Sequence, residues 1–242
     1  MRISRFFCPE LNITHTQFSL PEAAHRHAVQ VLRLKKGALI NVFDGQGQEY
    51  EATLEHVSKR ESVAVLGQKI ESQNESPLDI TLLQGISRGE RMDYALQKAV
   101  ELGVNKIIPV VTERCNVQLS NGRAEKRLSH WKGVMVSACE QSGRSVLPDL
   151  TNMMSLDEAM LINQQSSRLV LDPLAKQGFT TLEKQQQVTL LIGPEGGLSE
   201  QEIDVVTEHN YQTVNFGPRI LRTETATVAA IAVMQTLWGD LG

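Results

Sequence analysis

Two segments near the end of the chain constrain the fold most, because each joins an apolar strand-like run to a helical pattern through a Gly-Pro turn. The first contains Val188–Ile192 and Gly193–Gly197, and the second contains Val214–Phe216 and Gly217–Arg219. Glycines let a backbone approach a ligand closely, since no Cβ stands in the way. Open α/β sheets bind ligands past the carboxyl ends of their strands. The two loops therefore predict one pocket that is lined largely by main chain.

The glycine loops do not match the common phosphate-binding motifs. Gly193–Gly197 is not followed by the Gly-Lys-Ser/Thr of a Walker A loop, and it lacks the Gly-x-Gly-x-x-Gly of a Rossmann fingerprint. A helix that starts at Ser199 could attract an anion. However, no lysine or arginine lies between Lys184 and Arg219. This favours a ligand without phosphates.

The 242 residues are enough for one or two domains. Several short strand patterns and one helix predict a small β-barrel over residues 1–72. The polar residues 73–77 predict a linker. Strand patterns alternate with helices over residues 78–242, and this predicts an α/β domain with a mostly parallel sheet. Pro109 lies within one of its strand patterns and should make that strand short or place it at an edge.

Three Ser-x-x-Glu sequences predict capping boxes at helix starts, namely Ser19–Glu22, Ser155–Glu158 and Ser199–Glu202. The helix after Ser19 should continue to about residue 32. It carries His25 and His27 on different faces, so we interpret them as surface or RNA-facing residues rather than as metal ligands.

The composition is that of an ordinary soluble globular protein, with 41% hydrophobic and 21% charged residues. The apolar run Val228–Met234 is too short to span a bilayer, and no apolar signal core follows Met1–Arg5. We therefore expect a cytoplasmic protein. Cys8, Cys115 and Cys139 are isolated, which favours free thiols over a disulfide framework or a zinc site.

Basic residues concentrate at the start of the chain, although the net charge is −4. Residues 1–36 hold six basic side chains against two acidic ones. Electrostatic steering depends on the local field rather than on total charge, so such a face can bind phosphates. Composition alone leaves phosphate binding and a solvated basic face equally open.

The last expected helix, Thr225–Trp238, is apolar on almost every side. Such a helix must be covered all round. One face can pack on the sheet, and the other needs a second helix of this chain or a partner subunit. We favour a homodimer, with an ordinary core helix as the alternative.

Charged residues crowd onto the loop before that helix, where Arg219 and Arg222 flank apolar residues and Glu224 follows. A functional loop and a structural ion pair of Arg222, with Glu224 or with an acid elsewhere, both fit this pattern. Further arginines at predicted element ends should gather along one sheet edge: Arg88, Arg91, Arg114 and Arg144. We find no Ser/His/Asp or Cys/His triad, since His130 and His209 lie in helical patterns.

Six motifs carry a resemblance to a known family. They are Ser87–Met92 (SRGERM), Glu101–Val104 (ELGV), Glu113–Cys115 (ERC), Ala138–Arg144 (ACEQSGR), Leu191–Gly197 (LIGPEGG) and Gly217–Ala226 (GPRILRTETA). With these motifs the whole chain closely resembles the RsmE family of bacterial 16S rRNA uridine-N3 methyltransferases, within the knotted SPOUT superfamily. The set is highly specific, whereas IGPEGG alone is only suggestive.

The resemblance implies an N-terminal PUA-like RNA-binding β-barrel and a C-terminal α/β domain with a parallel sheet and a trefoil knot. It implies that S-adenosylmethionine binds, bent, in loops Leu171–Pro173, Ile192–Gly197 and Phe216–Ala226. It also implies a homodimer with each pocket near the subunit interface. The implied substrate is a uridine of 16S rRNA, within the 30S subunit, and no metal is implied.

The resemblance and the loop positions together give the expected site residues. The expected cofactor-binding residues are Leu171, Ile192, Gly193, Pro194, Gly196, Gly197, Phe216, Gly217, Ile220, Leu221, Thr223, Thr225 and Ala226. The expected RNA-binding residues are Arg5, Arg33, Lys35, Lys36, Arg88, Arg91, Arg114 and Arg144.

Methylation of uracil N3 requires loss of the N3 proton, after which negative charge develops over O2, N3 and O4. We expect Arg222, or Arg219, to stabilise that charge as oxyanion-type electrostatics do, with the proton passing to Glu224 or to water. Positioning should contribute heavily as well. The alternatives are a SPOUT methyltransferase that acts on another RNA or on a ribose hydroxyl, and a non-catalytic rRNA-binding assembly factor.

Overall fold

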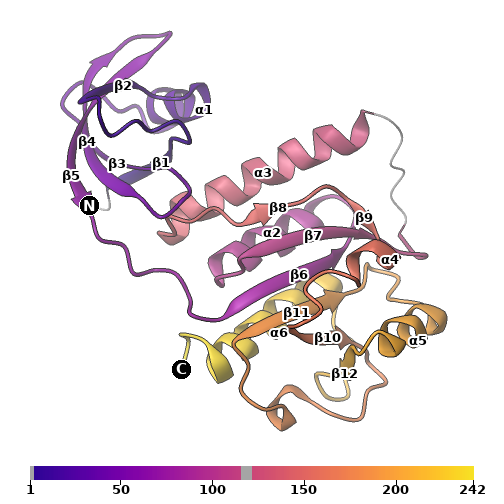
Figure 1. Cartoon of the computed structure of the whole chain (residues 1–242). Coiled ribbons are helices and arrows are strands. Elements are labelled where there is room, and N and C mark those ends of the chain that lie inside the picture. The colour runs from indigo at the N-terminus through magenta and orange to yellow at the C-terminus, as the bar shows by residue number, and fades with distance from the viewer. Residues whose placement is uncertain (1–2, 116–121) are drawn as a thin grey trace. The chain divides into compact units, whose positions relative to one another are not determined.

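The computed structural model describes residues 3–115 and 122–242 (Figure 1). The chain divides into an N-terminal unit, Met1–Glu75 with Val136–Leu147, and a C-terminal unit, Ser76–Met135 with Pro148–Gly242. The domains predicted from the sequence, residues 1–72 and 78–242, were each continuous, whereas residues 136–147 belong to the N-terminal unit. Helix α3 (Arg123–Ser142) therefore contributes its last residues to that unit.

A five-stranded sheet in the order β1-β3-β4-β5-β2 forms the N-terminal unit. Its strands are β1 (Ser4–Phe7), β2 (Gln17–Ser19), β3 (Leu39–Phe43), β4 (Glu49–Val57) and β5 (Ser62–Ile70). The pair β1–β3 is parallel and the other pairs are antiparallel. Apolar residues from these strands form the core of the unit, among them Phe6, Ile40, Val42, Leu54 and Ala64.

The helix of this unit starts later than predicted and changes type along its length. It consists of α1 (Glu22–Arg26) and the π-helix η1 (His27–Val31). The predicted capping box at Ser19 is wrong, because Ser19 pairs with Val63 in the sheet and Pro21 takes the capping position without a side-chain bond. The capping boxes at Ser155 and Ser199 are confirmed.

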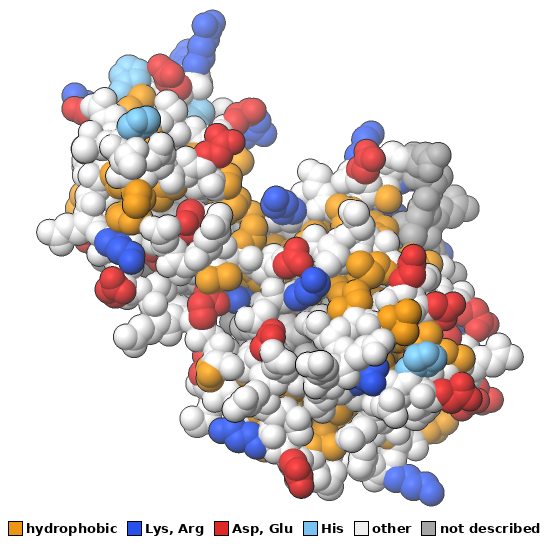
Figure 2. Space-filling model, viewed as in Figure 1, with side chains coloured by type: hydrophobic (Ala, Val, Ile, Leu, Met, Phe, Trp, Pro, Cys, Tyr) orange, Lys and Arg blue, Asp and Glu red, His pale blue; other side chains and the backbone are white. Residues whose placement is uncertain are grey.

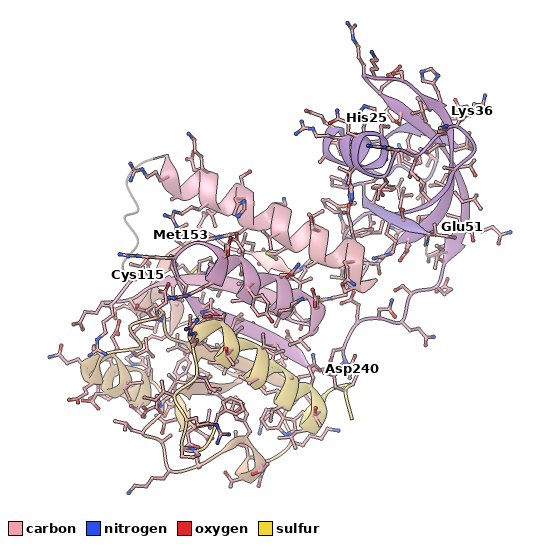
Figure 3. The ribbon with its side chains drawn as sticks, turned by 180° about the vertical axis from the view of Figure 1, so that it is seen from behind. His25, Lys36, Glu51, Cys115, Met153 and Asp240 are labelled. Atoms are coloured by element: carbon pink, nitrogen blue, oxygen red, sulfur yellow. The ribbon has the colours of Figure 1, made fainter. Side chains whose placement is uncertain are left out.

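The two histidines of this helix are not both at the surface. His25, labelled in Figure 3, is buried, and its Nδ1 lies 2.8 Å from Ser62 Oγ. The prediction of a surface position is therefore wrong for His25. His27 is half-buried, with its Nδ1 3.6 Å from a carboxylate oxygen of Glu140.

The C-terminal unit contains a parallel sheet in the order β12-β10-β11-β6-β7-β8, with β9 also paired to β7. Every strand pair in it is parallel. The predicted α/β domain with a parallel sheet is thus confirmed. Its strands are β6 (Asp79–Gly85), β7 (Lys106–Val111), β8 (Asp149–Leu150), β9 (Met154–Ser155), β10 (Ser167–Leu171), β11 (Gln187–Ile192) and β12 (Gln212–Val214).

Strand β7 is neither short nor at an edge, contrary to the prediction from Pro109. It pairs with β6 on one side and with β8 and β9 on the other. The two short strands pair at Lys106–Ile107 and at Val110–Val111, so Pro109 falls in the gap between them. The missing N–H of proline therefore interrupts no ladder on that side.

Helices cover both faces of this sheet. Helices α2 (Glu90–Glu101) and α6 (Thr223–Trp238) lie side by side on one face, and α4 (Leu156–Ala159) and α5 (Glu200–Glu208) lie on the other (Figures 1 and 3). Apolar residues of the sheet pack against α4 and α5, among them Leu83, Ile108, Val170 and Leu191, and Val206 of α5 belongs to the same core cluster. A short 3-10 turn, η2 (Phe179–Thr181), lies between β10 and β11.

The apolar sequence of helix α6 requires that neighbouring elements cover it, and α2 covers part of it. The buried side chain of Gln235 donates to Leu102 O at 2.8 Å and accepts from Ser76 Oγ at 2.7 Å. Leu237, near the end of the helix, stays 40% exposed. None of the described helices is long and apolar enough to cross a membrane.

Candidate functional site

A cavity of about 680 Å³ lies in the C-terminal unit, past the carboxyl ends of β10, β11 and β12. All of the predicted cofactor-binding residues except Thr225 line it, and so do Arg219, Arg222 and Glu224. Thr225 is exposed on α6. The structure thus brings three loops from distant parts of the chain to one cavity, as a parallel sheet does with loops at its carboxyl edge.

The first loop, residues 193–197, lies directly against the end of β6. A Cβ on Gly85 would lie 2.5 Å from Pro194 N and 2.7 Å from Gly193 C. Since such contacts are closer than atoms can approach, only glycine at position 85 lets the loop lie this near the sheet. Gly197 has a φ of +70°, a conformation that glycine adopts without strain.

The other two loops of the cavity, which follow β10 and β12, are joined to each other. Gly217 N donates to Asn215 Oδ1 at 3.2 Å, and Gly217 has a φ of +74°. Asp172 N, just after β10, donates to Val214 O at 3.0 Å. The ring of Phe216 lies 4.9 Å from that of Phe179, centroid to centroid. The contacts of Asp172 with Val214 and of Phe179 with Phe216 hold residues 172–179 and 214–217 together beside the cavity.

A buried polar network joins the first loop to the start of α6. Thr223 Oγ1 donates to Gly193 O at 2.7 Å and accepts from Gln84 Nε2 at 3.2 Å. Thr227 Oγ1 donates to Gln84 Oε1 at 2.7 Å. Gln84, Thr223 and Thr227 are all buried. The hydroxyl of Thr223, which was expected to bind the cofactor, is therefore engaged with the neighbouring loop.

Glu195 ties the first loop to the start of α2. Its Oε1 accepts from Arg88 N at 2.8 Å and lies 3.3 Å from Arg91 Nη1. Partial burial opposes ionisation, but the Arg88 N–H and the Arg91 guanidinium outweigh it and hold the pKa of Glu195 below its usual value. Glu195 is therefore an anion at neutral pH.

Arg114 ties the same loop to the segment after β7. Its Nη1 donates to Gly196 O at 3.1 Å and to Leu198 O at 3.3 Å. A Cβ on Gly196 would lie 3.0 Å from Arg114 Cβ. Arg91 and Arg114 line the cavity, and their contacts described here are with the loop itself. The RNA role expected for them remains a prediction.

Arg219 and Arg222 are exposed at the cavity, and neither has an acidic partner among the described residues. Glu224 Oε2 is buried and has no hydrogen-bond partner there either. The structural ion pair between Arg222 and Glu224 is thus absent from this part of the chain. Two guanidinium groups are therefore exposed at the cavity, and Glu224 is among the residues that line it.

The basic residues expected to contact RNA differ in exposure. Arg33, Lys35 and Lys36 are exposed in the segment after η1, as Figure 3 shows for Lys36. Arg5 and Arg144 are buried, and the RNA role expected for these two remains a prediction.

Both buried arginines are held in ion pairs of the N-terminal unit. Arg5 Nε and Nη2 each donate to the Glu49 carboxylate at 2.8 Å, and Arg144 Nη2 lies 2.7 Å from Glu75 Oε2. These bonds join residues 136–147 to the rest of the unit, because Arg5 also donates to the carbonyl of Cys139 at 2.6 Å. Phosphate contact would require breaking these pairs.

Sequence reasoning missed Gln84, Glu195 and Thr227. A glutamine within the apolar strand ITLLQG and a threonine within an apolar helix were the available signals. Buried polar residues of this kind need a partner, but the sequence did not reveal which one.

Among the described residues, no group of three or more His, Cys, Asp or Glu could hold a metal ion. Cys8, Cys115 and Cys139 are free thiols.

Comparison with known proteins identifies the family. The sequence pattern of an RNA methyltransferase domain matches residues 74–235, and that of an RNA methyltransferase PUA domain matches residues 20–66. A Buchnera aphidicola protein named ribosomal RNA small subunit methyltransferase E is 34% identical over 99% of this chain and 98% of its own length. The chain belongs to the ribosomal RNA small subunit methyltransferase E family.

Two solved structures match this chain over its full length. The enzyme of this name from Neisseria gonorrhoeae, bound to S-adenosyl methionine, is 41% identical with a TM-score of 0.93. A putative methyltransferase from Legionella pneumophila, in complex with the cofactor SAM, is 36% identical with a TM-score of 0.96. Each alignment covers all of both chains. The resemblance seen in the sequence motifs is therefore confirmed.

Proposed function

We propose that this protein transfers a methyl group from S-adenosylmethionine to N3 of a uridine in the 16S rRNA of the small ribosomal subunit. The observation that carries the proposal is the cavity of about 680 Å³ formed by loops 171–174, 192–198 and 214–226. It has the size of a small-molecule site, about 300–1,000 Å³. Family membership supplies the reaction class. Bacterial rRNA is cytoplasmic, so we place the enzyme there.

The cavity lining fits a cofactor that carries both signs of charge. Four arginines and four acidic residues line it: Arg91, Arg114, Arg219, Arg222, Asp172, Glu195, Glu200 and Glu224. Leu171, Ile192 and Leu221 supply apolar surface. S-adenosylmethionine has a carboxylate, an ammonium, a sulfonium and an apolar adenine face but no phosphate. The lining therefore suits its chemistry.

The charges of the site suit methylation of a uracil nitrogen. When it is bound, S-adenosylmethionine supplies an electrophilic methyl group. Arg222, or Arg219, is free to stabilise the negative charge that develops on the uracil oxygens once N3 loses its proton. Glu224, which lines the same cavity, or water accepts that proton. The N3 lone pair then forms the new N–C bond as the S–C bond breaks.

We propose that the N-terminal unit is a PUA-like barrel that contacts RNA phosphates through Arg33, Lys35 and Lys36. The exposed side of α5 does not suit this role, because acidic side chains gather along it (Figure 2). Three of them, Glu200, Asp204 and Glu208, recur every four residues and are exposed. RNA contacts are therefore expected away from α5.

We also propose that the C-terminal unit is knotted and that the protein is a homodimer. The large apolar side chains of Leu174 and Ile220 lie at the cavity and are 83% and 84% exposed. Exposed apolar surface around a cavity is typical of an interaction site, and a partner subunit would cover it. A monomer at every concentration in sedimentation would exclude the dimer.

One experiment tests the proposed function. The purified protein is incubated with S-adenosylmethionine carrying a labelled methyl group and either free 16S rRNA or 30S subunits, and the modified nucleotide is mapped by mass spectrometry. We expect N3-methyluridine. Methylation of another atom or RNA would favour the alternative SPOUT activity. Failure to bind S-adenosylmethionine in a calorimetric titration would favour a non-catalytic assembly factor.

A further inference from the structure

Two large apolar side chains of the N-terminal unit are exposed where a regular helix would bury them. Ala24 and Ala28, four residues apart, are both buried. In an uninterrupted α-helix, Val31 and Leu32 would follow Ala28 on the same face, because residues three and four apart lie above one another. Instead, Val31 is 66% exposed and Leu32 is 40% exposed. We call these two residues the apolar pair.

The backbone before the apolar pair accounts for its exposure. The π-helix η1 closes its turns on the fifth residue rather than the fourth, and Leu32 N accordingly donates to His27 O at 3.0 Å. This wider turn moves the apolar pair away from the face of Ala28. Single π-turns within helical segments are frequent at functional sites.

Arg33 follows the apolar pair in a backbone conformation that is costly for its residue type. Its φ is +54°, whereas the other non-glycine residues with positive φ in the described chain are asparagines, which tolerate this region better. The chain turns back here, so that Leu34 N donates to Ala28 O at 2.9 Å and Leu34 packs against the core. The apolar pair and Arg33 stay outside. Backbone strain of this kind concentrates at functional sites.

The surroundings of the apolar pair are positively charged. Arg33, Lys35 and Lys36 are exposed, and none of them forms an ion pair with another described residue. No acidic residue occurs in the sequence between Glu22 and Asp44. Such cations bind phosphates, but an apolar side chain gains free energy only from apolar surface. A partner that fits this segment therefore carries both phosphates and an exposed apolar face.

We propose that the apolar pair contacts the face of an unpaired nucleobase of the rRNA, next to the phosphates that Arg33, Lys35 and Lys36 bind. Unpaired bases are the ones whose faces RNA exposes to proteins, and apolar side chains such as leucine pack between bases in nucleic-acid complexes. The contact holds one nucleotide on the N-terminal unit and so positions the RNA. The inference rests on the proposed function, since it takes rRNA as the partner.

The salt dependence of RNA binding tests this contact in the full chain. The Kd for an unmodified 16S rRNA transcript is measured by filter binding at several potassium chloride concentrations. The double variant Val31→Ser, Leu32→Ser should raise the Kd about tenfold at every concentration, as loss of a stacked base does. It should leave the slope of log Kd against log salt unchanged, because no phosphate contact is lost. Lys35→Gln with Lys36→Gln should instead lower this slope by about 1.4, since each phosphate of a single strand contributes about 0.7.

Two further variants separate loss of the contact from loss of the fold. Val31→Thr keeps the size of the side chain and should raise the Kd about fourfold, because one methyl group leaves the contact. Leu161→Ser is the matched control. Leu161 is 53% exposed just after α4 and does not line the cofactor cavity, so its replacement should leave the Kd for rRNA unchanged. All variants should bind S-adenosylmethionine with the affinity of the unmodified protein.

Two outcomes would overturn the proposal. One is a Kd for rRNA that neither Val31→Thr nor the double variant changes. The other is a double variant that sediments as a monomer where the unmodified protein sediments as a dimer, since the apolar pair would then contact a second copy of the chain. Binding of rRNA without methyl transfer by the unmodified protein would instead reject the proposed function, and the Kd series would still decide the apolar contact.

Discussion

Thr223→Val removes the hydroxyl that joins the first loop to α6 and leaves the shape of the side chain nearly unchanged. The hydroxyl donates to Gly193 O and accepts from Gln84 Nε2, and both Thr223 and Gln84 are buried. Each buried group left without a partner costs about 1–3 kcal/mol. Gln84 Nε2 keeps its bond to Gly85 O at 3.2 Å, so Gly193 O is the group that loses its partner, and we expect the free energy of unfolding to fall by about 1–3 kcal/mol.

The same substitution should weaken cofactor binding, because Gly193 no longer has a fixed position at the cavity. A loss of about 1.4 kcal/mol in binding free energy corresponds to a tenfold increase in Kd. Urea denaturation measures the stability, and calorimetric titration with S-adenosylmethionine measures the affinity. Both measurements use the full chain.

Thr225→Val is the matched control, two residues along the same helix. Thr225 is exposed and does not line the cavity, so its replacement should change stability by no more than about 0.5 kcal/mol and leave the Kd unchanged. If the two variants behaved alike, the buried network would not hold the loop. If only Thr225→Val weakened cofactor binding, the original assignment of Thr225 as a cofactor residue would be correct.

Three further substitutions test other parts of the site. Gly85→Ala should weaken S-adenosylmethionine binding in titration, because its Cβ would lie 2.5 Å from Pro194 N and the loop must move; unchanged affinity would contradict this packing argument. Because the pKa of Glu195 is lowered, its ion pair with Arg91 stabilises the protein at pH values above the usual pKa of a glutamate. This stabilisation is lost as the pH falls through the lowered pKa. Glu195→Gln should thus reduce stability at neutral pH but not in strong acid, as melting curves at several pH values can check. Arg222→Ala should lower kcat about a hundredfold with little change in cofactor affinity; full turnover would refute its role.

Much of the site was predictable because its signals are local. Glycine turns that follow apolar runs located two of the loops, and a capping box needs only a serine and a glutamate three residues apart. Ser155 and Ser199 meet that condition at the start of a helix, and both form the box. Ser19 meets it in sequence, but it pairs with β5 and its side chain does not cap the helix. The local rule failed at Ser19 because this residue is part of a tertiary contact, the pairing of β2 with β5.

The contacts that join the loops are long-range, and the sequence does not specify them. Thr223 binds Gly193 and Gln84 across 30 and 139 residues, and Arg88 binds Glu195 across 107. The burial of Arg5 likewise depends on Glu49 and on carbonyls more than 130 residues away. From charge alone, Arg5 resembled the exposed Arg33.

By itself the sequence determined the α/β class, the strand–loop–helix units and, through its motifs, the family. It did so because periodicity, glycine turns and capping depend on residues that are close along the chain. Tertiary structure decided which polar groups are engaged and which are available. A hydrogen bond between distant residues forms only when folding brings both groups together, so the partners of Gln84, Glu195 and Arg5 appear only in three dimensions.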